Sequence, residues 1–300
     1  MGPAGLRLAV DAMGTRVELL VADDASESDL RAAGEDALAC IGDWHHRLSV
    51  FDKGSTVSAI NADAGKRAVC VDKDMLDLLL ACSRWHAETS GVFDVALGSL
   101  MKHHGFRGGA PVNPTPPTFG MRYVQIDEAE CAVFLTHPGV RLDFGGIAKG
   151  WAIDEACRML KESGVQSAII HGGTSTTQSI GTRPDGKAWR VKTHADRDAP
   201  IALLADTSLS VSAPSGRLNE HQQGHVLDPR TGDPTESVAL AAVVADSAAA
   251  SDMWATALLA LGERPGSMSG AFASILRSAQ GQWHIEGESA TRCVVDARSD

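Results

Sequence analysis

The chain is 300 residues long, with 44% hydrophobic and 22% charged residues, which is ordinary for a globular protein that buries a sizeable core. Its formal net charge of −11 argues against a nucleic-acid partner, because binding a phosphate backbone needs clustered Lys and Arg. The sequence has no apolar run long enough to span a membrane, no recognisable signal peptide and six scattered cysteines without a C-x-x-C pair. We therefore expect a cytoplasmic protein without an integral membrane segment.

The first part of the chain predicts a strand pair followed by two helices. Residues 6–22 alternate apolar and polar side chains and are interrupted by Gly14, which indicates a strand broken by a turn. Residues 27–48 carry apolar side chains at helical spacing, and Ser26 is a candidate N-cap with an acid three residues later. A second amphipathic helix is expected over residues 72–89.

The rest of the chain mixes strands and helices without regular alternation, which favours an α+β architecture. A proline-rich stretch, 108–120, reads as a surface connection. Strands are expected at 121–126 and 131–135, with a third leading into Asp143, and a helix over 148–163 should end at Gly164. Further strands are expected at 167–173, 188–194, 201–213 and 238–247, then a helix over 250–262, and one or two strands after residue 265.

The segment DFGGIAKGWAID, residues 143–154, places an acid, two glycines and a lysine before a predicted helix. Adjacent glycines let another group approach the main chain closely, and a helix N-terminus offers unpaired amides to a phosphate. Lys149 could add a point charge. Alternatively, the segment is a tight turn whose acid caps the helix and whose lysine is solvated. The segment alone does not decide between these two interpretations.

The helix over 250–262 carries Asp252 and Thr256 one turn apart, hence on one face. A carboxylate and a hydroxyl in this arrangement could ligate an oxygen-seeking cation such as Mg²⁺. The alternative is an acid that favours the helix dipole and a threonine that bonds back to the preceding turn.

Histidines and a glycine pair supply further candidates. His225 precedes the turn DPRTG and could transfer a proton or support that turn; without context the supporting role is favoured. The histidine pairs at 45–46 and 103–104 are interpreted as surface or packing residues. Residues 171–181, HGGTSTTQSIG, could grip a phosphate or sugar through amides and hydroxyls, or could be a polar loop that leaves a strand.

Taken in order, several motifs resemble the ApbE family, the FAD:protein FMN transferases. The motifs are AMGTRVELLV, LSVFDKGSTVSAINADAG, SGVFDVALGSLMKHHGF, RLDFGGIAKGWAIDEA, HVLDPRTGDP and ASDMWATALLALG. The resemblance covers about residues 13–262. It implies an α+β fold related to the T-fold, with mixed sheets and packed helices, in which residues 1–300 form a single domain of two closely joined lobes with a ligand cleft between them.

The resemblance also assigns roles to individual residues. Asp143 and Lys149 would contact FAD, and Gly146 would offer its carbonyl oxygen to Mg²⁺ together with Asp252 and Thr256. His225, or the carboxylate of Asp143, would accept a proton in catalysis. The positions expected around the flavin are Met13, Phe51, Val92, Phe93, Asp94 and Val226. Phe51 stands where family members often have Tyr, which removes a phenolic hydrogen bond but keeps a ring for stacking.

The activity implied by the resemblance is Mg²⁺-dependent transfer of FMN from FAD to a Thr or Ser hydroxyl of an acceptor flavoprotein, with release of AMP. Mg²⁺ would bridge the pyrophosphate oxygens and neutralise charge on the departing AMP. The alternatives are an FAD pyrophosphatase, in which water replaces the protein hydroxyl, and a flavin-binding or storage protein without turnover.

Overall fold

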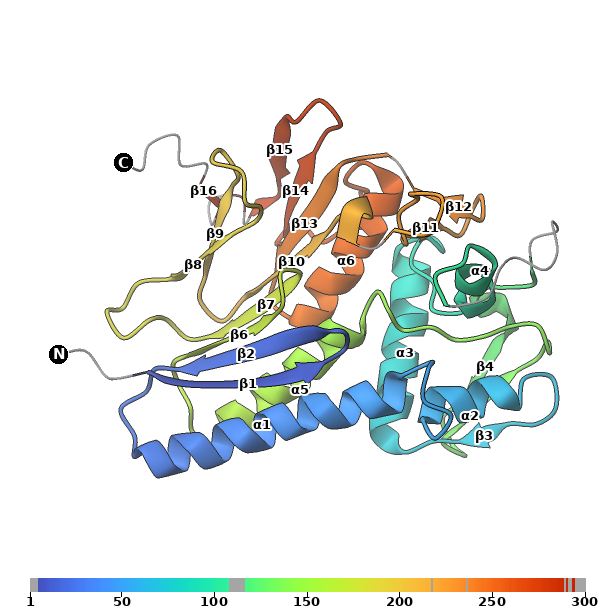
Figure 1. Cartoon of the computed structure of the whole chain (residues 1–300), viewed down its shortest axis with the longest axis horizontal. Coiled ribbons are helices and arrows are strands. Elements are labelled where there is room, and N and C mark those ends of the chain that lie inside the picture. Colours follow the sequence, from blue (N-terminus) through green and yellow to red (C-terminus); the bar gives the residue numbers. More distant parts are fainter. Residues whose placement is uncertain are drawn as a thin grey trace.

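A computed structural model of the chain describes residues 5–107, 117–216, 218–235, 237–288, 290 and 293–294. These residues form an α+β structure built on one large antiparallel sheet, with helices on one face and a smaller sheet on the other (Figure 1). The α+β class expected from the sequence is confirmed.

The large sheet has eight strands in the order β1-β2-β6-β7-β10-β13-β14-β15, and all neighbours are antiparallel. They are β1 (Leu6–Ala12), β2 (Thr15–Val21), β6 (Ala168–Gly172), β7 (Thr176–Ile180), β10 (Ser208–Ser212), β13 (Leu240–Ala245), β14 (Ala273–Arg277) and β15 (Trp283–Glu286). Strands β2 and β6 are neighbours, and the amide of Ala22 donates to the carbonyl oxygen of Ser167 at 2.8 Å. Residues 22–167 are therefore an insertion that leaves and re-enters the sheet at one place.

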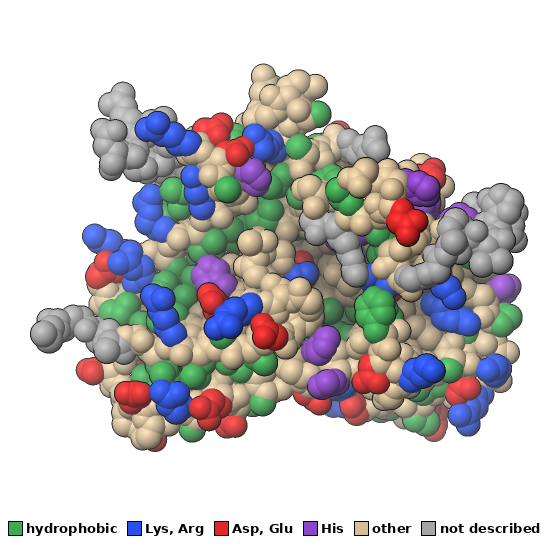
Figure 2. Space-filling model, viewed as in Figure 1, with side chains coloured by type: hydrophobic (Ala, Val, Ile, Leu, Met, Phe, Trp, Pro, Cys, Tyr) green, Lys and Arg blue, Asp and Glu red, His purple; other side chains and the backbone are tan. Residues whose placement is uncertain are grey.

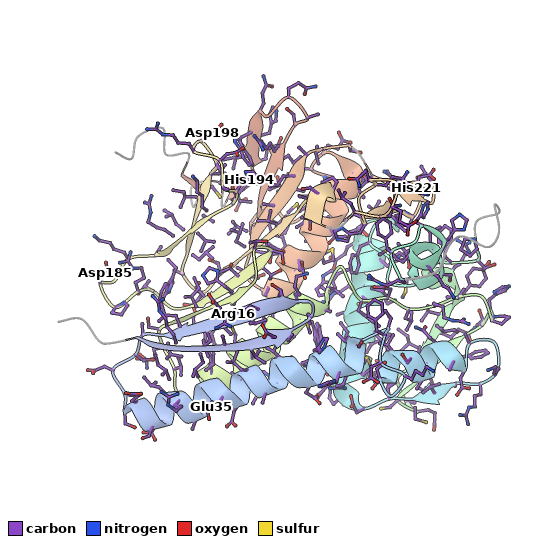
Figure 3. All side chains as sticks on the ribbon, viewed as in Figure 1. Arg16, Glu35, Asp185, His194, Asp198 and His221 are labelled. Atoms are coloured by element: carbon purple, nitrogen blue, oxygen red, sulfur yellow. The ribbon has the colours of Figure 1, made fainter. Side chains whose placement is uncertain are left out.

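Helices α1 (Glu27–Leu48), α5 (Ala148–Glu162) and α6 (Ala248–Leu261) cover one face of this sheet. Helix α1 packs on β1 and α5, α5 packs on α6, and α6 packs on β10 and β13. Trp44 of α1 and Trp151 of α5 meet edge to face, with ring centroids 6.1 Å apart. The exposed residue Glu35 of α1 points away from this layer (Figure 3). The main hydrophobic core lies between these helices and the sheet and continues beyond them through side chains such as Ile60, Leu79 and Leu135.

The opposite face of the large sheet is covered by a three-stranded sheet of β8 (Trp189–Lys192), β9 (Ile201–Leu204) and β16 (Cys293–Val294). Apolar side chains of both sheets form a second core between them, including Trp189, Leu204, Leu209, Val244 and Ile275. The large sheet is thus covered on both faces, which explains why its central strands carry few exposed residues.

The remaining elements lie beside the sheet and its helices, on the right of Figure 1. They are α2 (Thr56–Ala62), β3 (Val69–Cys70), α3 (Lys73–Glu88), α4 (Gly98–His103), the 3₁₀ turn Met121–Tyr123, β4 (Val124–Asp127), β5 (Ala132–Leu135), a second 3₁₀ turn (Pro214–Gly216), β11 (Leu227–Asp228) and β12 (Asp233–Pro234). The order β3-β5-β4 forms another small sheet. Nε2 of His104 lies 2.7 Å from the carbonyl oxygen of Gly232, which ties the end of α4 to the turn between β11 and β12.

Capping signals in the sequence explain the helix ends. The hydroxyl of Ser26 accepts from the amide of Asp29 at 3.2 Å and donates to its carboxylate at 2.7 Å, so the predicted helix over 27–48 is confirmed. Helix α3 begins after Asp72, which caps it, and α6 begins after Ser247 and ends at Gly262 in the left-handed conformation, with φ 78°.

Three expectations about strands are wrong. Residues 201–213, expected as one strand, form β9 and β10, which belong to different sheets. The segment that leads into Asp143 is not a strand, because its amides bond elsewhere: Leu142 donates to the side chain of Asn61 at 2.7 Å and Asp143 to the carbonyl oxygen of Val95 at 2.8 Å. The chain after residue 265 contributes three strands, β14, β15 and β16, rather than one or two.

Residues 108–116 of the expected proline-rich connection lie outside the described residues. In the part of the chain that is described, none of the helices is both long enough and apolar enough to cross a lipid bilayer.

Candidate functional site

Asp143 organises the loop that precedes α5. Its Oδ1 accepts from the amide of Gly145 at 2.8 Å and from Nη2 of Arg107 at 2.9 Å, and Nε of Arg107 bonds Oδ2. Both side chains are largely buried, so this ion pair is little screened by solvent. A Cβ on Gly145 would lie 2.8 Å from Nη2 of Arg107 and 3.0 Å from Oδ1 of Asp143, so a side chain at this position would disturb the ion pair. Arg107 did not stand out in the sequence, because no local pattern marks it as the partner of Asp143.

Gly146, the second glycine of the pair, faces α6. Its carbonyl oxygen accepts from the Thr256 hydroxyl at 3.4 Å. A Cβ on Gly146 would lie 3.3 Å from Cγ2 of Thr256 and 3.7 Å from the ring of Phe93. Two of the predicted metal-ligating residues are therefore in direct contact.

Asp252 lies one turn before Thr256 on the same face of α6 and is 3% exposed. Its Oδ2 accepts from the amide of Gly150 at 3.0 Å, and its Oδ1 accepts from the Ser210 hydroxyl at 3.0 Å. The amide of Gly150 is one of the unpaired donors of the first turn of α5. The carboxylate of Asp252 therefore lies between the beginning of α5 and strand β10.

The oxygens of Gly146, Asp252 and Thr256 fit a magnesium ion. Carboxylate, hydroxyl and carbonyl oxygens are the hard donors that Mg²⁺ prefers, and each carboxylate oxygen of Asp252 keeps a second lone pair beside its hydrogen bond. No cluster of three or more His, Cys, Asp or Glu that could hold a metal occurs among the described residues. With one carboxylate, the set resembles sites at which substrate phosphates complete the coordination of Mg²⁺.

Lys149 is the second residue of α5 and is half-buried. Its ammonium makes no ion pair or hydrogen bond with another described residue. A cation beside unpaired amides is unfavourable for the helix itself and suits a site that receives an anion. The phosphate-binding interpretation of the 143–154 segment is therefore compatible with this placement.

Met13 lies in the two-residue turn between β1 and β2. Met13 and Gly14 have φ of 53° and 73°, the left-handed pair that a type I′ hairpin requires. The amide of Met13 donates to Nδ1 of His45 at 3.1 Å, so a histidine of α1 holds the turn in place. A shallow depression of about 380 Å³ adjoins this turn and is lined by residues 11–16 and His45. Arg16 follows the turn on β2 (Figure 3).

Phe51, expected beside the flavin, is 66% exposed although it is a large apolar residue. The guanidinium carbon of Arg107 lies 5.8 Å from the centre of its ring. Phe51 is therefore an unpacked aromatic face next to the Arg107–Asp143 ion pair, which is a suitable surface for stacking a planar ligand.

Val92, Phe93 and Asp94 are buried in the protein interior. The carboxylate of Asp94 accepts from the amides of Ala96 at 2.7 Å and Met121 at 2.9 Å, and burial raises its pKa. Asp94 therefore joins two loops, and the ring of Phe93 lies beside Gly146. Their contact with a flavin stays a prediction.

His225 and Val226 precede strand β11. The half-buried ring of His225 lies edge-on to Phe106, with ring centroids 6.5 Å apart, while Val226 is buried in the main core. Phe106 and Arg107 are consecutive, so one dipeptide contacts both His225 and Asp143. The two residues predicted to act in catalysis are thereby linked.

The predicted site residues thus form a connected group. Gly146 contacts Thr256 in the middle of α6, and Asp252, one turn earlier on α6, bonds the first turn of α5. The Arg107–Asp143 pair connects this point to Phe51 and, through Phe106, to His225. Figure 2 shows the surface hollowed between the part that carries the large sheet with α6 and the part that carries α3 and α4. Met13 lies apart from these contacts, on the β1–β2 turn.

The interpretation of residues 171–181 as a phosphate-gripping or polar loop is wrong for most of the segment. Thr176–Ile180 form the buried strand β7, and only the turn at 173–175 is a loop. The hydroxyls of β7 pair within the sheet and its core: Thr177 bonds Nδ1 of His171 at 3.0 Å and Ser179 bonds the carbonyl oxygen of Thr207 at 3.0 Å. Hydroxyls can be buried when they are hydrogen-bonded. The polar composition of this segment therefore does not reveal that it is an interior strand.

These features define an α+β protein whose candidate site combines oxygen donors, a lysine at the start of a helix and an exposed aromatic ring. The sequence pattern of the ApbE family matches residues 13–269. One curated relative, a protein of Klebsiella pneumoniae named FAD:protein FMN transferase, is 30% identical over 73% of this chain and 72% of its own length. A second Klebsiella pneumoniae protein of that name is 27% identical over 87% of this chain and 80% of its own.

The ApbE protein of Thermotoga maritima has the same fold, with a TM-score of 0.84 over 96% of this chain and 98% of its own at 23% identity. The chain belongs to the ApbE family. It is accordingly an enzyme of the transferase class.

Proposed function

We propose that the protein is a Mg²⁺-dependent FAD:protein FMN transferase, which moves FMN from FAD to a Thr or Ser hydroxyl of an acceptor flavoprotein and releases AMP. The observation that carries the proposal is the convergence of Gly146, Asp252 and Thr256 at the beginning of α5. The names of the curated relatives support the flavin as donor and a protein as acceptor.

In this proposal the carboxylate of Asp252, the hydroxyl of Thr256 and the carbonyl oxygen of Gly146 hold the metal. Bound there, Mg²⁺ would supply positive charge to the pyrophosphate of FAD. Lys149 adds a second positive charge at the same helix end, Phe51 stacks on the isoalloxazine, and Asp143 with Arg107 fixes the loop that carries Gly146.

The transfer is a displacement at the FMN phosphorus. The acceptor hydroxyl oxygen forms a new bond to phosphorus, the bond between that phosphorus and the AMP oxygen breaks, and the hydroxyl proton passes to a base. We assign His225 as this base, since an imidazole is suited to proton transfer near neutral pH, with Asp143 as the other candidate.

We also propose that residues 1–300 act as one catalytic domain of two lobes, because Phe51 and Asp143 come from the insertion while Asp252 and Thr256 lie on α6, which packs on the large sheet. The cytoplasmic location expected from the sequence stays a prediction.

The test is an incubation of purified protein with FAD, Mg²⁺ and an acceptor domain that bears a Thr or Ser flavinylation segment, followed by mass spectrometry. A metal-dependent gain of one FMN on the acceptor together with free AMP supports the proposal. Asp252→Ala should abolish the gain, whereas Asp36→Ala, at an exposed position of α1, should not. Release of FMN and AMP without modified acceptor would indicate a pyrophosphatase. Intact, bound FAD would indicate a storage protein.

A further inference from the structure

Five polar side chains lie in the protein interior where β7, β10 and α6 meet. Thr176, Ser208, Ser210 and Ser251 are each 0% exposed, and Asp252 is 3% exposed. Buried hydroxyls are costly unless they are hydrogen-bonded. Ser208 bonds Ser251, while Thr176, Ser210 and Asp252 form a chain of their own. The Thr176 and Ser210 hydroxyls are 3.1 Å apart across the paired strands, and Ser210 lies 3.0 Å from Oδ1 of Asp252.

The single proton of the Ser210 hydroxyl has three acceptors within reach, one of which is Oγ1 of Thr176 at 3.1 Å. Besides Asp252, the carbonyl oxygen of Ser175 lies 3.1 Å away, but that oxygen already accepts from the amide of Val211 at 2.6 Å. A carboxylate is the stronger acceptor. The proton therefore goes to Asp252, and the Ser210 oxygen accepts from Thr176, which gives one direction of donation: Thr176 to Ser210 to Asp252.

We infer that Ser210 is a positioning residue for the metal ligand Asp252, with Thr176 fixing the orientation of the Ser210 hydroxyl. The inference rests on the proposed function, because it concerns the proposed Mg²⁺ site. Ser210 donates to Oδ1 while the Gly150 amide donates to Oδ2, so both oxygens of the carboxylate are held. Partners that orient a ligating carboxylate contribute to metal affinity although they never touch the metal.

Ser208 provides a matched control on the same strand. It is two residues from Ser210, on the same face of β10 and equally buried. Its hydroxyl bonds the carbonyl oxygen of Ser247 at 2.6 Å and the hydroxyl of Ser251 at 2.9 Å, and makes no bond to Asp252. Loss of Ser208 should loosen the packing of α6 on β10 without releasing the carboxylate.

The experiment measures binding of Mn²⁺, a paramagnetic substitute for Mg²⁺, to the full chain by electron paramagnetic resonance titration. ADP is present because its phosphates can complete the coordination sphere of the metal. Near-ultraviolet circular dichroism confirms that each variant is folded. We expect Ser210→Ala to weaken Mn²⁺ binding about 10- to 100-fold and Ser210→Thr, which keeps the hydroxyl, to restore most of the affinity. Ser208→Ala should bind as the wild type does.

Thr176→Val keeps the shape of the side chain and removes only the donor to Ser210, so a smaller loss, about two- to fivefold, is expected. This variant provides the test if Ser210→Ala does not fold. Equal affinity in wild type, Ser210→Ala and Thr176→Val would overturn the inference and leave the proposed metal site intact. An equal loss in Ser210→Ala and Ser208→Ala would also overturn it, because general loosening of α6 would then be the cause. Absence of Mn²⁺ binding by the wild type would overturn both the metal site and the role of Ser210.

Discussion

Asp154 and Asp252 each bind the beginning of the helix that carries the other. Asp154 of α5 accepts from the amides of Ala248 at 2.7 Å and Ala249 at 2.8 Å in the first turn of α6, and Asp252 of α6 accepts from the amide of Gly150 in the first turn of α5. The first amides of a helix have no partner within it and carry partial positive charge. The two carboxylates therefore fix the relative placement of α5 and α6, and with it the distance between Gly146 and Thr256.

Replacing Gly150 by alanine should destabilise the protein, although the same change usually stabilises a helix by about 0.5–1 kcal/mol. A Cβ at this position would lie 2.4 Å from the carbonyl oxygen of Ala248, so α6 would have to move. We expect a loss of about 1–3 kcal/mol in the free energy of unfolding, measured by urea denaturation. Gly42→Ala in α1 is the control, because nothing lies within 4 Å of its Cβ position, and it should stabilise. A stabilising Gly150→Ala would contradict the close approach of the helices.

The stability that Asp154 contributes should fall as the pH rises. Burial raises the pKa of Asp154 from 3.8 to about 6 against the opposing effect of its hydrogen bonds. The folded state therefore binds the proton more tightly than the unfolded state, and the contribution is complete below about pH 4 and lost as the pH rises through about 6. The free energy of unfolding of the wild type relative to Asp154→Asn should drop by roughly 2–3 kcal/mol from pH 4 to pH 7. A difference that stayed constant over this range would show that burial does not dominate.

Arg107 and Asp143 should be strongly coupled. Removing Arg107 alone leaves a buried carboxylate without its cation, which costs about 3–5 kcal/mol, and the double variant Arg107→Ala/Asp143→Ala should recover part of that loss. Urea unfolding of the two single variants and the double variant gives the coupling energy. Arg158 and Glu162 on the exposed face of α5 are the control pair, with an expected coupling of about 0.5 kcal/mol or less. Equal couplings for the two pairs would show that burial adds nothing.

Phe51→Ala should weaken FAD binding without destabilising the fold. The side chain is 66% exposed, so its loss removes little packing. The melting temperature of the Phe51→Ala variant should therefore stay close to that of the wild type. Loss of aromatic stacking of about 0.5–1.5 kcal/mol corresponds to roughly a 2- to 13-fold weaker affinity, measured by quenching of flavin fluorescence. Phe51→Tyr keeps the ring and should bind at least as well as the wild type. Unchanged affinity in Phe51→Ala would exclude stacking on this residue.

Local signals in the sequence were sufficient for much of the fold. The cap at Ser26, the break at Gly14 and the stop at Gly262 predicted the ends of α1, the β1–β2 turn and the end of α6. Strand β7 was missed because its Thr, Gln and Ser residues are polar and nevertheless buried. Their burial depends on partners in other strands, which no local pattern reveals.

The candidate site likewise divides into residues that local motifs predict and residues that only long-range contacts reveal. Gly146, Asp252 and Thr256 are predicted because they lie in recognisable motifs. In the structure Gly146 contacts Thr256, and Asp252 bonds the first turn of α5, while their role as metal ligands stays a prediction. Arg107 and Ser210 were not found, since each matters through one long-range contact, with Asp143 and Asp252 respectively. Such residues become visible only when the strands and loops that carry them are placed in space.

The insertion of residues 22–167 between neighbouring strands has a consequence for how the protein reaches its native state. Pairing β2 with β6 closes a very long loop. Such closures slow folding because the chain loses conformational entropy before the contacts between the strands can form. Phe51 and Asp143 lie inside that loop, while Asp252 and Thr256 follow it in the chain. The candidate site is therefore complete only once this loop and α6 are both in place, so a ligand bound there would stabilise the contact between these two parts of the fold rather than one part alone.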